Sequence, residues 1–173
     1  MSVVQKLADW GQRQAAKYAQ GHQRPISGYL SAMGVYGAGV AGLVAVARRR
    51  NVRLPDGISP WDLALFGVAT HKLSRTLSKD AVTSPLRAPF TAFQGRQAPA
   101  ELAEEPRKES AAQHAVGELI TCPFCLAQWV ATGFVAGSVF APRATKLAAG
   151  TFASVAVSDF LQFVYAKLQQ QEE

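Results

Sequence analysis

Charged residues are scarce in this 173-residue chain, and that scarcity narrows its class. Asp, Glu, Lys and Arg make up 17% of the sequence, against roughly 25% in globular domains. A chain with so few charges and 49% hydrophobic residues is neither disordered nor a coiled coil. Two cysteines exclude a small secreted disulfide scaffold, and the length predicts one domain at most.

Motifs of several enzyme and carrier classes are also missing. There is no Gly-x-Ser-x-Gly elbow and the three histidines are scattered, which argues against Ser-His-Asp catalysis. No Gly-rich phosphate-binding motif occurs, and we expect no cofactor. The net charge of +6 is spread along the chain rather than gathered in a stripe, so we expect anionic lipid headgroups and no nucleic acid as partners. A transporter would need more spans and an inverted repeat.

Three long runs are almost free of charge. They cover residues 26–47, 122–141 and 147–166, and Asp159 is the one charged residue among them. A helix needs about 20 apolar residues to cross a hydrocarbon core of roughly 30 Å. We therefore predict an all-α integral membrane protein with three transmembrane helices and one short hydrophobic or interfacial helix.

The first transmembrane helix is predicted to have basic segments on both sides. Residues 1–25 form a basic amphipathic segment that either lies among lipid headgroups or is a solvated helix. Residues 26–55 form an anchor and a basic linker. Small residues recur every fourth position in the anchor, at Gly34, Ala38 and Gly42, which is the pattern that lets two membrane helices approach closely.

Residues 60–168 are predicted to form a membrane domain of three parts. The first is a short helix over 60–77, with Ser59 as its N-cap and Pro60 at its first position. Its charge-free stretch is too short to span unaided, and whether it crosses or lies at the interface is left open. A polar loop over 78–118 follows, in which prolines disfavour helix over 83–90 and the segment 99–106 is acidic and mobile. Helix resumes at 109–120 and leads into a helical hairpin over 122–166.

Two cysteines form a Cys122-Pro-Phe-Cys125 motif at the start of the second span. With Thr121 as the N-cap, both sulfurs would lie in the first helical turn, where the helix N-terminus stabilises a thiolate. The motif suits dithiol–disulfide exchange. It also supplies two zinc ligands, which His114, His71 or a second subunit could complete, although a metal site is the less favoured reading. Simple packing of small residues at the helix start is the reading we favour for both sulfurs.

Asp159 lies inside the third span and therefore needs a partner. In a hairpin it would be level with Trp129, so that Gln128, Asp159 and Gln162 form an intramembrane polar cluster below the cysteines. His71, Lys72 or Arg75 from the short helix could neutralise the carboxylate. The cluster is either a proton relay for the dithiol or a hydrogen-bonded clasp between helices.

The uneven distribution of Lys and Arg predicts which ends face the cytoplasm. Twelve of these 18 residues are cytoplasmic in either of two arrangements. In one, the short helix does not cross the membrane; in the other, all four hydrophobic elements cross and the N-terminus is inside. Both arrangements place Cys122 and Cys125 at the cytoplasmic face.

Five segments together resemble a known family. They are residues 61–75, 79–91, 104–107, 117–130 and 157–162, and they contain Trp-Asp-Leu-Ala-Leu-Phe-Gly, Thr-Ser-Pro-Leu-Arg-Ala-Pro-Phe, Glu-Glu-Pro-Arg, Thr-Cys-Pro-Phe-Cys and Ser-Asp-Phe-Leu-Gln. Their order is similar to the bacterial membrane-protein family catalogued as domain of unknown function 1360, over about residues 60–168. Some members of that family are labelled sporulation proteins. The resemblance implies a multi-pass protein of the bacterial cytoplasmic (inner) membrane and no established activity.

These observations favour a structural or interaction role in an envelope assembly. Asp80, Arg87 and Trp129 are the residues we expect to contact a partner, which would be another membrane protein or a second copy of the chain. The first alternative is a membrane thiol–disulfide protein that uses Cys122 and Cys125, with Asp159 as proton relay. The second is a metal-binding membrane dimer.

Overall fold

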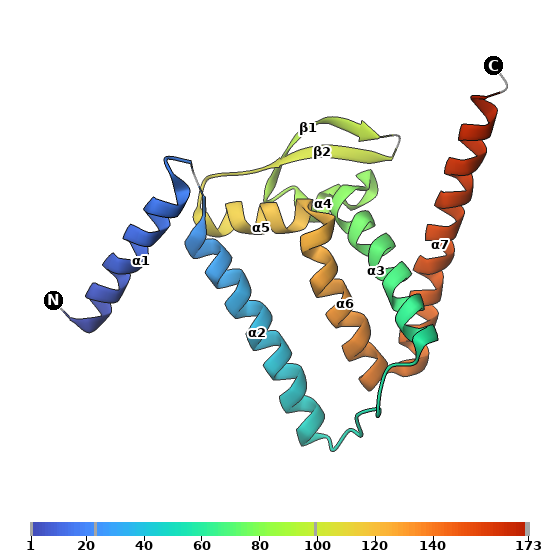
Figure 1. Ribbon diagram of the computed structural model, residues 1–173, viewed down its shortest axis with the longest axis horizontal. Coiled ribbons are helices and arrows are strands. Elements are labelled where there is room, and N and C mark those ends of the chain that lie inside the picture. The colour runs from blue at the N-terminus through green and yellow to red at the C-terminus, as the bar shows by residue number, and fades with distance from the viewer. Residues whose placement is uncertain (1, 23, 99, 172–173) are drawn as a thin grey trace.

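A computed structural model describes residues 2–22, 24–98 and 100–171 (Figure 1). It is mainly helical and has one small sheet. In chain order the elements are α1 (Val3–Ala19), α2 (Ile26–Arg49), α3 (Pro60–Lys79), η1 (Ala81–Thr83), α4 (Ser84–Arg87), β1 (Thr91–Ala98), β2 (Glu101–Pro106), α5 (Ala111–Thr121), α6 (Pro123–Phe140) and α7 (Pro142–Gln169).

The three predicted spans form three long helices. Among the described residues, α2, α6 and α7 are long and apolar enough to cross a membrane, which confirms the three-span prediction at that level. The turn between α6 and α7 is tight because Gly137 lies against Thr145; a Cβ at Gly137 would come within 2.6 Å of the Thr145 hydroxyl oxygen.

The short hydrophobic element is the helix α3, and it lies between α6 and α7. Its N-terminus is built as predicted: Ser59 Oγ accepts a hydrogen bond from the Asp62 N–H at 3.0 Å. Phe66 of α3 stacks on Phe134 of α6 with ring centroids 5.8 Å apart, and Ala149 of α7 completes this core. Burial of this apolar surface holds the three helices together.

The polar loop differs from the prediction, because it contains a β-hairpin and two short helices. The strands β1 and β2 pair antiparallel, with Thr91 opposite Pro106 and Ala98 opposite Glu101. The fold is therefore not purely α-helical, and residues 101–106, expected to be mobile, form a strand. The expectation that 83–90 is not helical is also wrong: α4 tolerates Pro85 because the first turn of a helix needs no N–H from that residue.

Together η1, α4, β1, β2 and α5 form a layer that we call the cap. Figure 1 shows α5 lying across one end of α2 and α6, with the hairpin above it. Gly117 allows this packing, because a Cβ there would lie 2.7 Å from the Phe90 carbonyl oxygen and 2.9 Å from Cβ of Pro106.

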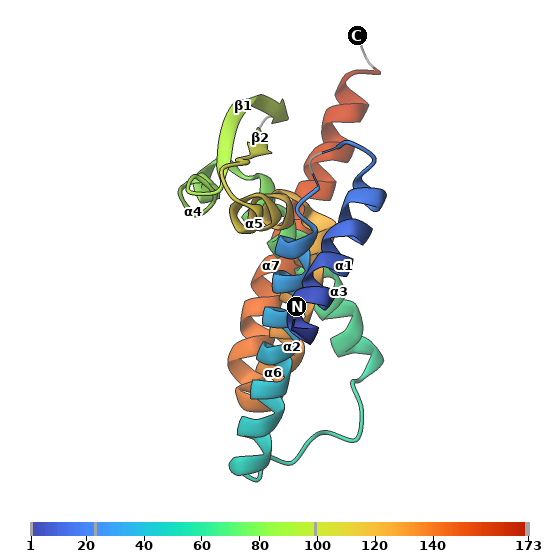
Figure 2. The ribbon, with the colours of Figure 1, turned by 90° about the vertical axis from the view of Figure 1, so that its left-hand side faces the viewer.

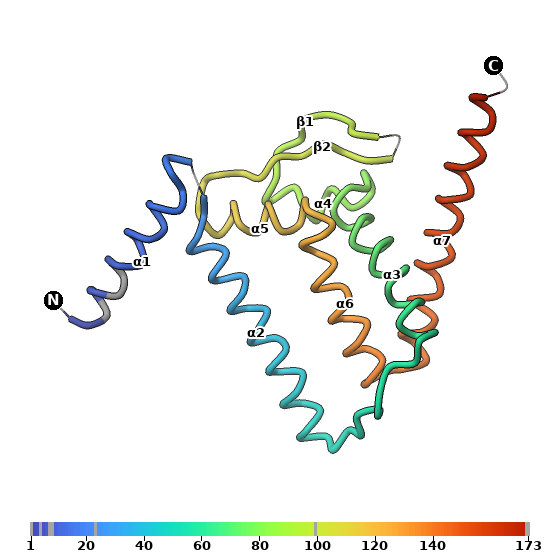
Figure 3. Tube along the Cα trace, in the orientation of Figure 1, coloured from blue at the N-terminus to red at the C-terminus, as the bar shows by residue number. Residues whose placement is uncertain are grey.

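The cap and the 50–59 connection lie at opposite ends of the helices (Figure 2). The helix α3 starts at the same end of the molecule as the α6–α7 turn and finishes at the cap (Figure 1). Among the described residues it is not one of the helices that are long and apolar enough to cross a membrane, so whether it crosses stays a prediction. The tube in Figure 3 also shows α7 continuing past the level of α5.

Candidate functional site

A cavity of about 500 Å³ lies where α2 meets α5 and α6, directly beneath the cap. Its wall includes Tyr29, Glu118, Cys125, Gln128 and Trp129. Three of these five residues, Cys125, Gln128 and Trp129, are candidates that the sequence had singled out. The cavity is therefore a place where several of the predicted site residues lie together.

The crossing of α2 over α5 depends on Gly28. A Cβ at this position would overlap the carbonyl oxygen of Ala111 and lie 2.6 Å from Cβ of Ala115. Gly28 is buried, so the two helix backbones touch here. The close approach brings the next residue, Tyr29, within reach of α5.

Glu118 is the centre of the polar contacts at this crossing. Its carboxylate accepts hydrogen bonds from the Tyr29 hydroxyl and from Arg24 Nη1, the latter at 3.3 Å. His114 Nε2 lies 3.5 Å from the same carboxylate, one turn earlier on α5. Sequence reasoning missed Glu118 and Tyr29 because a single carboxylate in an amphipathic helix and a single tyrosine in a span carry no motif.

The two cysteines lie at the break between α5 and α6. Cys122, not Thr121, is the N-cap of α6: its Sγ accepts a hydrogen bond from the Cys125 N–H at 3.2 Å. Thr121 instead ends α5 and its hydroxyl donates to the Gly117 carbonyl at 2.8 Å. The N-cap prediction was wrong because Pro123 forces the residue before it, Cys122, into an extended conformation. Both thiols are free; Cys122 is half-buried and Cys125 is exposed toward the cavity.

Gln128 and Trp129 contact α2. The Gln128 side-chain amide donates to the Tyr36 hydroxyl at 2.8 Å, and the same hydroxyl lies 2.8 Å from Thr132 Oγ1. Trp129 meets the Tyr36 ring edge-on, with centroids 5.0 Å apart. These contacts tie the middle of α2 to α6.

The predicted cluster of Gln128, Asp159 and Gln162 is not formed. Asp159 binds Lys72 Nζ at 2.8 Å, while the Gln162 amide donates to Ser158 at 3.4 Å on its own helix. The prediction treated α6 and α7 as neighbours along their whole length, whereas α3 lies between them. Of the three partners expected for Asp159, the structure selects Lys72.

Arg75 of α3 and Asp80 at its end also have partners within the chain. Arg75 makes a bidentate ion pair with Glu101, at 2.7 and 2.9 Å. Oδ2 of Asp80 lies 4.0 Å from Lys72 Nζ. Asp80, which was expected to contact a partner, therefore interacts with a residue of its own chain.

Arg87 is buried, which corrects its assignment as a residue that contacts a partner. Its side chain is 1% exposed. Its guanidinium donates to Glu104 at 2.5 Å, to the Leu77 and Asp80 carbonyl oxygens at 2.9 and 3.1 Å, and to Thr83 Oγ1 at 2.7 Å. Arg87 therefore joins the end of α3 to the hairpin and holds the cap together.

The small residues of α2 remain uncovered. Gly34, Ala38 and Gly42 are exposed, and a Cβ added at Gly34 or Gly42 would meet no atom within 4 Å. Within the described part of the chain, this ridge packs against nothing.

The chemistry available at the cavity is that of a dithiol beside a carboxylate and a phenol. No group of three or more His, Cys, Asp or Glu side chains among residues 2–22, 24–98 and 100–171 is placed to hold a metal ion. A metal site would therefore need ligands from a second chain.

Comparison with known proteins gives one match. No curated protein and no solved structure matches this chain. A family described as "Protein of unknown function (DUF1360)" matches residues 65–165, which include most of α3, the cap, α6 and most of α7. Because the match covers more than half of the chain, the chain belongs to the DUF1360 family.

Proposed function

We propose that this protein is a structural or interaction component of an assembly in the bacterial cytoplasmic membrane, and that α2 is the helix through which it associates. Its partner is another membrane protein or a second copy of the chain. In this role the α3–α6–α7 unit and the cap form the rigid body, and α2 presents the contact surface.

The uncovered ridge of Gly34, Ala38 and Gly42 is the observation that carries this proposal. Small residues at this spacing let helix backbones approach closely in a membrane, where van der Waals contact drives association. The cap end of α2 is fixed by Gly28 and Tyr29, so the ridge is held in one orientation. Only 6% of the residues in the apolar stretch of each of α2, α6 and α7 are buried within the chain, which leaves room for partners.

The distribution of basic residues relative to the lipid bilayer supports the same arrangement. Twelve of the 18 Lys and Arg residues belong to segments at the cap end, which favours a cytoplasmic cap. The helix α1 carries Lys6, Arg13 and Lys17, with Trp10 and Tyr18 exposed beside them. We propose that it rests on anionic headgroups at that surface.

Cysteine crosslinking in membranes tests the association. In a Cys122→Ser/Cys125→Ser background, Ala38→Cys should give a disulfide-linked or bis-maleimide-linked product, because close-packed ridges bring paired cysteines together. Val40→Cys is the matched control, since it lies on the same helix and faces α6. The size of the product distinguishes a homodimer from a complex with another protein.

Two outcomes would count against the proposal. One is the absence of any product from Ala38→Cys, and the other is equal crosslinking of Ala38→Cys and Val40→Cys. Adding Gly34→Leu to the Ala38→Cys chain should lower the yield severalfold, because the leucine separates the two backbones.

Thiol–disulfide exchange is the second candidate function, and one observation favours it. Cys122 and Cys125 are free, adjacent and next to a cavity. Here the dithiol would reduce a partner protein's disulfide and itself become a disulfide, with both thiol protons transferred to the released partner thiols. The carboxylate near Cys125 is that of Glu118 and not that of Asp159, because Glu118 and Cys125 both line the cavity. A chain that lacks Cys122 and Cys125 but still crosslinks through Ala38→Cys would assemble without the dithiol. This result would separate the structural role from thiol–disulfide exchange.

A further inference from the structure

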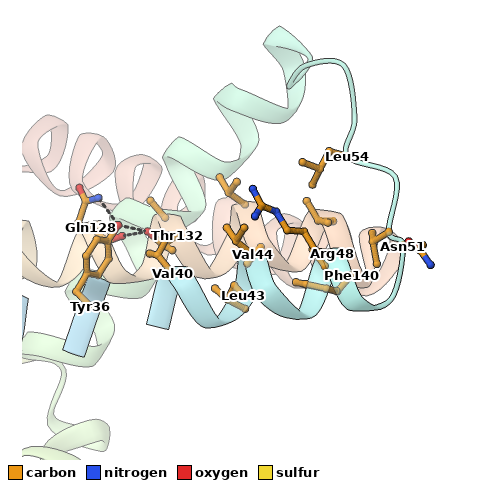
Figure 4. Close-up of a pocket in the computed structure, with 16 residues that line it drawn as sticks. Tyr36, Val40, Leu43, Val44, Arg48, Asn51, Leu54, Gln128, Thr132 and Phe140 are labelled. Carbon is orange, nitrogen blue, oxygen red and sulfur yellow. Dashed lines mark hydrogen bonds between the residues drawn. The ribbon is translucent and has the colours of Figure 1, made fainter. Parts of the chain in front are cut away.

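A second and larger hollow lies between α2 and α6, on the side away from the cap. It has a volume of about 880 Å³. Val40, Leu43 and Val44 of α2 form one wall, and Val135, Val139 and Phe140 of α6 form the other (Figure 4). The hollow exists because α2 and α6 stay apart along their length and do not pack closely on each other (Figure 1).

The groove has the length of a lipid chain. Tyr36 and Arg48 both line it and are twelve positions apart on α2, which corresponds to about 18 Å at 1.5 Å per residue. One leaflet of a bilayer contributes about 15 Å of hydrocarbon, half of a core of roughly 30 Å. Since α2 and α6 are both long and apolar enough to span, the groove opens to the hydrocarbon of a membrane.

The two ends of the groove differ in charge. At the inner end, Tyr36, Gln128 and Thr132 satisfy one another by hydrogen bonds and carry no charge. At the outer end, Arg48 and Asn51 line the opening, and Figure 4 shows the Arg48 side chain lying along the groove toward Val44. In the described part of the chain no carboxylate is within ion-pair distance of Arg48.

The sequence beyond Arg48 adds to this positive end. Arg49, Arg50 and Arg53 follow within five residues, and the structure gives none of them an acidic partner among the described residues. A guanidinium at the surface end of an apolar groove complements one ligand class, an acyl chain that carries an anionic phosphate. A zwitterionic lipid would match the apolar wall and offer the same phosphate, but its cationic amine would be repelled by the arginines at this end.

We propose that the α2–α6 groove is a binding site for an acidic phospholipid, with one acyl chain between the two helices and the phosphate on Arg48. The site lies in the leaflet next to the 50–59 connection. It rests on the membrane insertion that the proposed function assumes, but not on association through the Gly34–Gly42 ridge.

Lipid binding to the full-length protein can be measured by native mass spectrometry after purification in detergent. Phosphatidylglycerol should bind as one retained molecule per chain and about tenfold more tightly than phosphatidylcholine, because both lipids carry the phosphate but the cationic choline of phosphatidylcholine is repelled by Arg48. Arg48→Gln should remove this preference. Arg49→Gln is the matched control, because it makes the same charge change one residue away and does not line the groove.

A second variant tests the groove itself. Ala136→Phe adds volume to the α6 wall without changing charge, and it should reduce retention of phosphatidylglycerol while Arg48 is intact. Equal loss in Arg48→Gln and Arg49→Gln, or equal binding of the two lipids to the wild-type chain, would overturn the proposal. Crosslinking through Ala38→Cys should be unchanged by Arg48→Gln, so failure of this site and failure of the association are distinguishable.

Discussion

Arg87 and Glu104 are 17 positions apart, and the pair they form is deeply buried, with side chains 1% and 6% exposed. A buried ion pair is stabilising only when its remaining donors and acceptors are satisfied. Arg87 meets this condition through the Leu77 and Asp80 carbonyl oxygens and the Thr83 hydroxyl. The residue therefore fixes the position of the cap on α3.

Removing this guanidinium should weaken the fold strongly. Arg87→Met leaves the Glu104 carboxylate buried without its partner, and breaking a buried pair in this way costs about 3–5 kcal/mol. Arg96→Met is the control, because Arg96 is exposed on β1 and a surface charge contributes little. Thermal unfolding of the purified protein in detergent measures the loss of stability in each of the two variants. An Arg87→Met variant as stable as Arg96→Met would contradict a structural role for Arg87.

Residues at the cavity show how far sequence alone could lead. Cys125, Gln128 and Trp129 were identified because a Cys-x-x-Cys pair and polar or aromatic residues stand out in an apolar run. Glu118 and Tyr29, which line the same cavity, were not identified, because their contact with each other arises from a crossing of two helices about 90 positions apart. The predicted cluster around Asp159 failed for the same reason, since nothing in the spacing shows that α3 separates α6 from α7.

At the scale of elements, helices were predictable and the hairpin was not. Long charge-free runs and the Ser59 cap locate α2, α3, α6 and α7 because these signals are local. The strand β2 contains three glutamates in six residues, which indicates a solvated loop when its partners are unknown. Arg75 and Arg87 supply those partners from outside the hairpin, so the strand depends on tertiary contacts.

The crossing of α2 and α5 should be sensitive to a single added side chain at Gly28. Gly28→Val places side-chain atoms where the Ala111 carbonyl and Ala115 already lie, and overpacking of this kind costs about 1–3 kcal/mol. Gly37→Val is the control, because a Cβ at Gly37 meets no atom within 4 Å and the cost in helix propensity is the same.

The same unfolding assay can be combined with maleimide reactivity of Cys125. Gly28→Val should lower the unfolding temperature and speed the labelling of Cys125, because the cavity wall contributed by α2 moves away. If Gly37→Val has as large an effect, the contact at Gly28 does not fix α2.

At the scale of the whole molecule, the helices connect two chemically different ends. One end has the cap, the start of α2, the end of α7 and the two thiols; the other has the 50–59 connection and the α6–α7 turn (Figure 2). The ion pair between Lys146 and Asp62, at 2.9 Å, joins α7 to α3 at the second end, and the pair of Lys72 with Asp159 joins the same helices near the first. Because these two ion pairs join α3 to α7 toward either end of the molecule, α3 is held alongside α7 even though its C-terminal half is basic.

We propose that α3 crosses the membrane together with the three apolar helices, so that the cap and the 50–59 connection lie on opposite sides. In a Cys122→Ser/Cys125→Ser background, single cysteines at Gln97 in β1 and Asp56 in the connection can be labelled with a membrane-impermeant maleimide. We predict that Asp56→Cys is labelled in intact cells and Gln97→Cys only after permeabilisation. Labelling of both positions in intact cells, or of neither, would place them on one side and contradict the account.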